Sequence, residues 1–298
     1  MSDPAQTGVL CVGRLYCDLI FTGMPRLPSY GTEVFADGFG VHVGGGAFIT
    51  AAHLAALGQP ASLATLLPNA PFSELVLPGL HAAGVDLGLS HPMPAGTEPQ
   101  VTVALAGTGD RAFVTRRSGP AFPDVTAADL TRAGIRHVHI GELATLLERP
   151  SILDTARAAG ATISLDCGWD EAIRPADAAP FIAAVDVFLP NEDEAAWLAE
   201  GGVTAPFAPL TVVKCGAAGA RAQTCDAVVE VAAAPVEAID TTGAGDAFNA
   251  GFLACWLKGQ ALRACLAAGN ARGALAVTGR GGFQAEPTRL RPAANLSK

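Results

Sequence analysis

The stretch IDTTGAGDAFNAGF, residues 239–252, joins a glycine-rich turn to an apolar helical pattern. Apolar residues recur at about 3.6-residue spacing from Ala247 onward, which predicts that a helix begins near Asp246. The first turn of a helix leaves backbone N–H groups unpaired and carries a partial positive charge, so it suits an anion such as phosphate. Gly243 and Gly245 allow successive N–H groups to converge on that anion. The alternative interpretation is an ordinary glycine-rich loop in which Asp246 only caps the helix.

Length, charge and composition narrow the classes of protein. A chain of 298 residues that is half apolar can bury a large core. With 28 acidic residues against 19 Lys and Arg, the formal charge is −9, and no basic run is longer than Arg116-Arg117. Nucleic acid and anionic membranes are therefore not expected as partners. The N-terminus has an early acid and no cationic segment before an apolar stretch, unlike a signal peptide, so we expect a cytoplasmic protein.

Two features that suggest special chemistry have ordinary explanations. Glycines and prolines interrupt the uncharged stretch 38–73 well below about 18 continuous apolar residues, so a buried helix and strand explain it better than a membrane span. Seven cysteines form no C-x-x-C pair and six histidines form no H-E-x-x-H spacing. We therefore expect no metal site built from His or Cys ligands.

Short β-rich segments alternate with longer amphipathic helical segments, which predicts an α/β domain around a mostly parallel sheet. The expected strands are residues 9–12, 62–66, 137–140, 162–165, 185–189 and 211–213. The expected helices are residues 49–57, 72–82, 127–133, 151–159, 192–199, 246–258 and 261–277. No linker is long enough to split the chain, so we expect residues 1–298 to form a single domain.

Two segments break this alternation. Residues 19–43 carry prolines and glycines among β-prone residues, and residues 98–117 are typical of a hairpin that turns at Gly107. We expect them to pair as a small β lid, of about residues 14–43 and 98–117, over the ligand ends of the parallel strands. An isolated small sheet needs its open face covered, so the lid also suggests a homodimer.

Several motifs, in order along nearly the whole chain, resemble those of the ribokinase-like carbohydrate kinases, the PfkB family. They are DTTGAGD at 240–246, GGGAFITAAHLAALG at 44–58, LPNEDEAAWL at 189–198, VVKCGAAGA at 212–220 and GNARGALAVTGRGG at 269–282. The resemblance implies a three-layer α/β/α sandwich with a central, mostly parallel sheet and a small β lid. It also implies a kinase that uses ATP and Mg²⁺ to phosphorylate a hydroxyl of a sugar or sugar derivative.

The resemblance assigns roles residue by residue. Asp246 corresponds to the catalytic base, and the backbone of Gly243, Ala244 and Gly245 to the anion hole. The residues implied on the Mg·ATP side are Asn191, Lys214, Gly216, Gly219 and Asn270, with Glu194 acting through water on the metal. Asp240 and Thr242 correspond to positions where some members hold a monovalent cation such as K⁺.

Simpler interpretations stand beside these roles. Asn191 and Glu194 also fit a helix cap with a first-turn acid. Gly216 and Gly219 also fit a hairpin turn between two strands. Lys214 departs from the small hydroxyl residue that is usual in the family, so its charge either reaches a phosphate or is simply solvated.

On the acceptor side, Asp18 follows the first strand, where the family places an acid that accepts hydrogen bonds from substrate hydroxyls. A carboxylate suits this task because it is acceptor-only and takes two donors at once. The resemblance further implies that Gly44 and Gly45 let the backbone approach the sugar and that Glu142 faces the substrate.

Ile49 is the departure that bears most on the acceptor. Sugar kinases of the family commonly carry Asn at this position to hydrogen-bond the substrate, and Ile offers neither donor nor acceptor. Either the acceptor lacks a polar group there, or another side chain such as Thr50 or His42 compensates.

Rival functions can be ranked from the residues. The chain has neither a Walker A motif nor the G-x-G-x-x-G of a dinucleotide-binding fold. A nucleoside kinase of the same fold is the main rival, because Ile49 with Tyr16, Phe35 and Phe39 favours a flatter, less hydroxylated acceptor. A non-catalytic, ligand-sensing relative is the rival from another class, and the intact anion loop argues against it.

Overall fold

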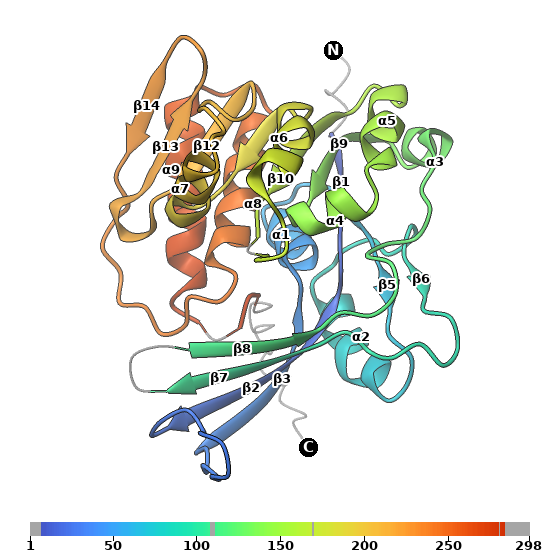
Figure 1. Cartoon of the computed structure of the whole chain (residues 1–298). Helices are drawn as coiled ribbons and strands as arrows, with labels where there is room; N and C mark the ends of the chain where they lie inside the picture. The colour runs from blue at the N-terminus through green and yellow to red at the C-terminus, as the bar shows by residue number, and fades with distance from the viewer. Residues whose placement is uncertain (1–6, 108–110, 169, 280, 284–298) are drawn as a thin grey trace, which may run out of the picture.

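The large sheet is the centre of the computed structural model, which describes residues 7–107, 111–168, 170–279 and 281–283 (Figure 1). The described residues place eight strands in this sheet. Their order is β14 (Val228–Val231), β13 (Ala220–Gln223), β12 (Leu210–Lys214), β11 (Val187–Leu189), β10 (Thr162–Asp166), β9 (Ile135–Ile140), β1 (Gly8–Val12) and β4 (Ala61–Ala64). Neighbours from β4 to β12 pair in parallel, and β13 and β14 are antiparallel additions at one edge. The expected mostly parallel sheet is confirmed.

Helices cover both faces of this sheet, as alternation along β1 shows. Val9 and Cys11 pack into the apolar cluster of α1 (Gly46–Ala56), α8 (Ala244–Trp256) and α9 (Leu262–Ala276). Leu10 and Val12 pack into the opposite cluster, since successive side chains of a strand point to opposite faces. The helices of that second layer are α3 (Ala127–Arg132), α4 (Leu143–Glu148), α5 (Ser151–Ala158), α6 (Pro175–Ala183) and α7 (Glu192–Glu200). The fold is a three-layer α/β/α sandwich.

A second, four-stranded sheet lies apart from the first, below it in Figure 1. Its order is β3 (Gly38–Gly44), β2 (Tyr16–Met24), β7 (Val101–Gly107) and β8 (Arg111–Arg116). Of the expected hairpin turn, Gly107 ends β7 and residues 108–110 lie outside the described part. Helix α2 (Phe72–Ala82) packs against this sheet through β2 and β3. The short strands β5 (Leu66–Leu67) and β6 (His91–Pro92) pair beside it.

Several elements differ from the sequence-based expectation. Helices α4 and α6 were not expected, because α4 is short and prolines at 175 and 180 obscure the helical pattern of α6. Strand β14 was missed, and β13 was expected only through the hairpin interpretation of Gly216 and Gly219; β13 alternates buried with half-buried residues and β14 exposed with half-buried ones, as is typical of a sheet edge. Helix α8 begins at Ala244, two residues before the expected start. Among the described residues, no helix is both long and apolar enough to cross a bilayer.

Candidate active site

The carboxyl ends of four parallel strands bring polar side chains to one edge of the large sheet. Glu142 follows β9, Asp166 ends β10, Asn191 follows β11 and Lys214 ends β12. In doubly wound folds, ligands bind outside these strand ends. The N-terminus of α8 meets the same edge, since Lys214 at the end of β12 contacts Gly245 and Asp166 at the end of β10 contacts Asn249.

The predicted anion loop has the geometry of an uncapped helix start. Gly243 is the N-cap of α8 in the left-handed region, with φ 70°, and no side chain caps the helix. Gly243 O accepts from Ala247 N at 2.9 Å, which closes the first turn. Ala244 N donates to Thr241 O at 3.3 Å, a long bond for this pair of atoms. No side chain therefore occupies the N-terminus of α8, which is compatible with the expected anion loop.

Asp246 lies in the first turn of α8 against the start of α1. A Cβ atom added to Gly46 would lie 2.8 Å from Asp246 Oδ1, so the carboxylate occupies the space that a side chain there would need. Burial raises the pKa of Asp246 to about 8, and the nearby Asp166 adds to the shift while Lys214 opposes it. A half-buried carboxylate with a pKa near neutrality is suited to take up a proton during a reaction.

Lys214, Asp166 and Asn249 form a buried polar cluster behind this loop. Lys214 Nζ lies 2.7 Å from Asp166 Oδ1, and Asn249 Nδ2 donates to Asp166 Oδ2 at 2.6 Å. The side chains of Lys214 and Asp166 are only 12% and 10% exposed, so the interpretation of Lys214 as a solvated charge is wrong. Sequence reasoning missed Asp166 and Asn249; the one signal for Asp166 was an acid that ends the apolar strand TISLD.

Asn191 and Glu194 form a reciprocal capping box at the start of α7. Asn191 Oδ1 accepts from Glu194 N at 2.8 Å, and Glu194 Oε2 accepts from Asn191 N at 2.7 Å. Burial raises the pKa of Glu194, and Lys214 opposes this shift. Glu194 Oε1 accepts no hydrogen bond from the described residues. The helix-cap interpretation therefore holds in this structure, and one carboxylate oxygen stays available.

The other residues implied at the nucleotide side lie around β12 and β14. Gly216 begins the 3₁₀ turn Gly216–Ala218 between the antiparallel strands β12 and β13, as the hairpin interpretation predicted. Gly219, at φ 109°, has no room for a side chain, because an added Cβ would lie 2.1 Å from Val231 O. Asn270 of α9 donates through Nδ2 to that same Val231 O at 2.9 Å. The three residues thus share one corner of the sheet.

Asp240 and Thr242 contact each other and anchor the anion loop. Asp240 Oδ1 accepts from Thr242 N at 2.8 Å and from Thr242 Oγ1 at 2.7 Å, while Asp240 Oδ2 accepts from Gly281 N at 2.9 Å. The described residues contain no group of three or more acids, histidines or cysteines arranged to hold a metal ion. In this structure the pair ties the loop to the segment at 281–283.

The acceptor-side residues meet where the second sheet joins the first. The Asp18 carboxylate of β2 covers Gly44, since an added Cβ on Gly44 would lie 2.0 Å from Asp18 Oδ2. Burial raises the pKa of Asp18 to about 7, and a hydrogen bond from Thr102 lowers it in part. Gly45 is the N-cap of α1, with φ 104° and no capping side chain. A second uncapped helix N-terminus thus points to this side of the site.

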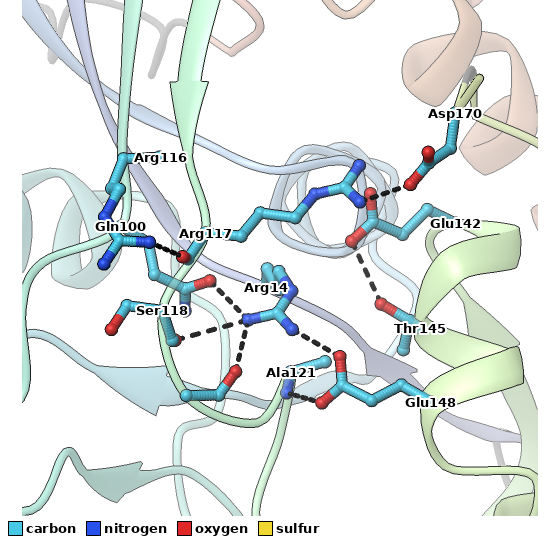
Figure 2. Close-up of polar contacts among 11 residues, drawn as sticks. Arg14, Gln100, Arg116, Arg117, Ser118, Ala121, Glu142, Thr145, Glu148 and Asp170 are labelled. Carbon is cyan, nitrogen blue, oxygen red and sulfur yellow. Dashed lines mark hydrogen bonds and ion pairs between the residues drawn. The ribbon is translucent and has the colours of Figure 1, made fainter. Parts of the chain in front are cut away.

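Glu142 lies beneath an arginine that sequence reasoning missed. Figure 2 shows Arg117, just after β8, reaching from the second sheet toward Glu142 and Asp170. Arg117 Nη1 lies 2.5 Å from Asp170 Oδ2, and the guanidinium also donates to the Tyr16 hydroxyl. Glu142 Oε1 accepts from Thr145 Oγ1 at 3.0 Å. Burial raises the pKa of Glu142, and Arg117 opposes the shift.

Arg14 joins the two sheets at the base of this cluster (Figure 2). Its guanidinium donates to Gln100 Oε1 at 2.7 Å and to Gly119 O at 2.8 Å, and it forms an ion pair with Glu148. Ala121 N donates to the other oxygen of Glu148 at 2.8 Å. Since these partners come from residues around both β7 and β8, Arg14 fixes the strands that carry Arg117.

Ile49 packs beside the anion loop. An added Cβ on Gly243 would lie 3.1 Å from Ile49 Cγ2, and one on Gly282 would lie 2.3 Å from Ile49 Cδ1. The side chain therefore fills the space between the loop and the 281–283 segment. His42 lies next to Gly281, and Thr50 Oγ1 donates to Asp246 O at 3.3 Å. Thr50 thus acts on the backbone of the loop in this structure.

Comparison with known proteins agrees with this geometry. Residues 6–289 match the sequence profile of the pfkB family carbohydrate kinases. The chain is 32% identical to an ATP-dependent ribose-1-phosphate kinase of Halopiger xanaduensis, over 97% of this chain and 98% of that protein. It is 26% identical to a ribokinase of Bacillus subtilis, over 94% of this chain and 96% of that protein.

Solved structures show the same fold. The Arabidopsis thaliana ribokinase complexed with ribose and ATP is similar with a TM-score of 0.77 at 20% identity, over 92% of this chain and 94% of that chain. A Methanocaldococcus jannaschii nucleoside kinase is similar with a TM-score of 0.78 at 20% identity, over 92% and 93%. The expected ribokinase-like fold is confirmed. The chain belongs to the pfkB family of carbohydrate kinases, enzymes that transfer a phosphoryl group to an alcohol.

Proposed function

We propose that this protein transfers the γ-phosphoryl group of ATP to a hydroxyl of a sugar or sugar derivative, with Asp246 as the base. The observation that carries the proposal is the place of the Asp246 carboxylate. It lies in the first turn of one uncapped helix, α8, and against Gly46 at the start of another, α1. One helix start serves the phosphoryl group and the other lies toward the acceptor, with the base between them.

Asp246 accepts the hydroxyl proton as the oxygen attacks, and the N–H groups of Gly243, Ala244 and Gly245 donate to the phosphoryl oxygens. Phosphoryl transfer depends mainly on positioning and on charge stabilisation, which suits a rigid anion loop. The loop is held at both sides, by Asp240 through Thr242 and by the side chain of Ile49. The base and the anion hole therefore share one short segment without competing for the same group.

ATP would lie along the corner formed by Lys214, Gly216, Gly219 and Asn270. Magnesium would be held through water by Glu194, whose Oε1 accepts no hydrogen bond from the described residues while Oε2 is fixed by Asn191 N. Carboxylate oxygen is a ligand that suits Mg²⁺ and its bound waters. When bound, the metal neutralises charge on the phosphates. The E. coli neighbour described as a putative ribokinase II in complex with ATP and Mg²⁺ supports this cofactor pair.

The acceptor would contact Asp18, Glu142 and the backbone of Gly44 and Gly45. Buried carboxyl groups whose pKa values are raised can accept from sugar hydroxyls or, when protonated, donate to them. Ribose-1-phosphate, ribose and fructose are the acceptors suggested by the names of similar kinases. Arg117 lies next to Glu142 and offers a cation to an acceptor that carries an anionic group.

A nucleoside is the second candidate acceptor, which the apolar side chain of Ile49 favours. Phe39 gives this candidate less support than the sequence suggested. Phe39 of β3 pairs with Phe21 of β2, and His42 of β3 pairs with Asp18 of β2. Phe21 and Asp18 are three residues apart on β2, an odd separation. Alternation therefore places Phe39 on the face of the second sheet opposite to Asp18.

Two finer proposals accompany the activity. A monovalent cation such as K⁺ would bind beside Asp240 and Thr242. Higher turnover in KCl than in tetramethylammonium chloride of equal ionic strength would support this site.

The second sheet would act as a lid on one continuous kinase unit and as the interface of a homodimer. Its exposed apolar groove supports the interface, since Phe35 and Phe39 are 78% and 60% exposed.

The decisive experiment is an ADP-release screen over ribose-1-phosphate, ribose, fructose and several nucleosides, with Mg·ATP. Turnover with a sugar or sugar phosphate supports the proposal, and turnover with nucleosides alone supports the second candidate. Absence of turnover with every acceptor, in a protein that binds ATP, would instead favour a ligand-sensing protein. The product's phosphate position is then assigned by ³¹P NMR.

A further inference from the structure

The ammonium group of Lys214 lies directly behind the anion loop. A Cβ atom added to Gly245 would lie 3.3 Å from Lys214 Nζ and 3.7 Å from its Cδ and Cε atoms. The side chain reaches this position from the end of β12, and its backbone N donates to Pro190 O at 2.8 Å. The positive charge therefore lies close to the backbone of Gly245 in the anion loop.

Asp166 and Asn249 hold the ammonium in place without using all its donors. Lys214 Nζ lies 2.7 Å from Asp166 Oδ1 and 3.5 Å from Asn249 Oδ1, and Asn249 in turn donates to Asp166 at 2.6 Å. An ammonium has three N–H donors, and the second contact is at the limit of a hydrogen bond. In the part of the chain that the structure describes, the third donor has no protein acceptor.

The ammonium keeps its charge despite its burial. Burial alone would lower the pKa of Lys214, but the carboxylates of Asp166 and Glu194 raise it above its ordinary value. Asp246 also contributes to this shift. A cation that is held in a buried position and has a spare donor is suited to bind an anionic oxygen, because little reorganisation is needed.

We propose that Lys214 is a phosphate-binding residue of the anion loop, held there by Asp166 and Asn249, and that it binds the terminal phosphoryl group of the nucleotide. This inference rests on the proposed kinase function and extends it to a residue that departs from the usual family pattern. Asp166 and Asn249 act through Lys214 and are positioning residues. With this cluster, the site would favour ATP over ADP more strongly than a site that offered only backbone N–H groups.

A different result is expected if Lys214 and Asp166 form only a structural ion pair. Such a pair would contribute to the free energy of unfolding, yet its loss would change the binding of ATP and ADP equally. The relevant measurement is therefore the ratio of the two dissociation constants, determined by calorimetry in the presence of Mg²⁺ and without an acceptor. This readout does not depend on turnover.

The test compares wild type with Lys214→Gln, whose amide can still donate to Asp166 but is neutral. Removing one partner of a buried ion pair can unfold a protein, so the second variant combines Lys214→Gln with Asp166→Asn, which makes both partners of the pair neutral. Lys258→Gln is the matched control, because Lys258 is exposed beyond the far end of α8. Circular dichroism confirms that each variant is folded.

We expect Lys214→Gln and the double variant to bind ATP about tenfold or more weakly, as for the loss of one charge-assisted hydrogen bond, and ADP less than about threefold more weakly. Lys258→Gln should match wild type. An equal loss of affinity for ATP and ADP in a folded variant, or no loss, would overturn the inference about Lys214. Turnover by the wild-type protein would still support the kinase function in that case. Wild-type protein that binds neither nucleotide would overturn both.

Discussion

The Asp246 carboxylate occupies the space in front of Gly46, so that a methyl group at Gly46 would lie 2.8 Å from Asp246 Oδ1 and 3.0 Å from Gly141 O. This contact joins the first turns of α1 and α8. Gly46 belongs to a glycine triplet whose motif suggested only a close approach to the acceptor. The structure adds that the third glycine leaves room for the base.

Gly46→Ala should therefore move the base rather than unfold the protein. The new methyl group would push the carboxylate out of line, because the carbonyl of Gly141 blocks the other direction. We expect kcat to fall by about tenfold to a hundredfold, since small displacements at a reacting centre are costly, with little change in ATP affinity. Steady-state kinetics and calorimetry measure the two effects. Gly88→Ala, in an exposed loop, is the control, and equal kcat values in the two variants would contradict this role for Gly46.

Asp246→Asn tests the base directly. We expect turnover to fall by about a hundredfold or more while ATP binding persists, because the amide cannot take up the proton. The wild-type kcat/KM for the acceptor should rise with pH through about 8, the pKa to which burial raises Asp246. Near-normal turnover of the variant, or a flat wild-type profile between pH 6 and 9, would argue against Asp246 as base.

The same raised pKa predicts a change in stability. The folded protein holds the proton of Asp246 up to about pH 8, whereas the unfolded chain releases it near the ordinary carboxyl pKa of 3.8. Stability therefore falls as the pH rises from about 4 to about 8, because the native state binds more protons over that range. Asp246→Asn lacks this penalty, so its stability relative to wild type should increase by a few kcal/mol between pH 5 and pH 8.5, at roughly 1.4 kcal/mol per pH unit below the folded-state pKa. Urea denaturation at both pH values measures the difference, and a gain that does not depend on pH would be inconsistent with it.

The lid surface gives a prediction about assembly. Phe39 is 60% exposed and contacts Phe21 at a ring-centroid distance of 5.1 Å, in the apolar groove of the second sheet. If a second copy covers this groove, Phe39→Lys should convert a dimer to a monomer in analytical ultracentrifugation, because a charge would have to be desolvated at the interface. Leu275→Lys, on the exposed face of α9, should leave the sedimentation coefficient unchanged. A monomeric wild type would contradict the proposed homodimer.

Local patterns were enough to predict the parallel strands of the large sheet and the glycine turn that begins α8, but not the side-chain pairs between distant segments. The spacing after Gly243 located the start of α8 to within two residues, because caps and helical periodicity are local properties. Asp166 and Asn249 were missed, since their importance comes from a contact that spans 83 residues. Lys214 was left open between two interpretations, because a charge at a strand end is usually solvated. Only the fold shows that Lys214 is buried and that it pairs with an acid at the end of β10, two strands away in the sheet.

Arg117 gives the last prediction, which concerns the acceptor. Its guanidinium bonds to Asp170 at 2.5 Å and lowers the pKa of the buried Glu142, which burial raises. Arg117→Met should raise the pKa of Glu142 further, so that the protonated carboxyl group loses acceptor capacity for a substrate hydroxyl. An anionic acceptor would in addition lose its cation. We expect the acceptor KM to rise about tenfold with the ATP KM unchanged, and the rise to be larger for a sugar phosphate than for the free sugar.

The neighbouring Arg116 provides a matched control for this variant. Arg116 also forms an ion pair, with Glu98, but both side chains are exposed on the second sheet, where such pairs contribute little. Arg116→Met should therefore keep the wild-type acceptor KM. If Arg117→Met and Arg116→Met behave alike, Arg117 only ties the second sheet to Asp170 and does not act on the acceptor. If the rise is equal for a sugar and its phosphate, Arg117 acts through Glu142 rather than on an anionic group, because only a direct contact distinguishes the two acceptors.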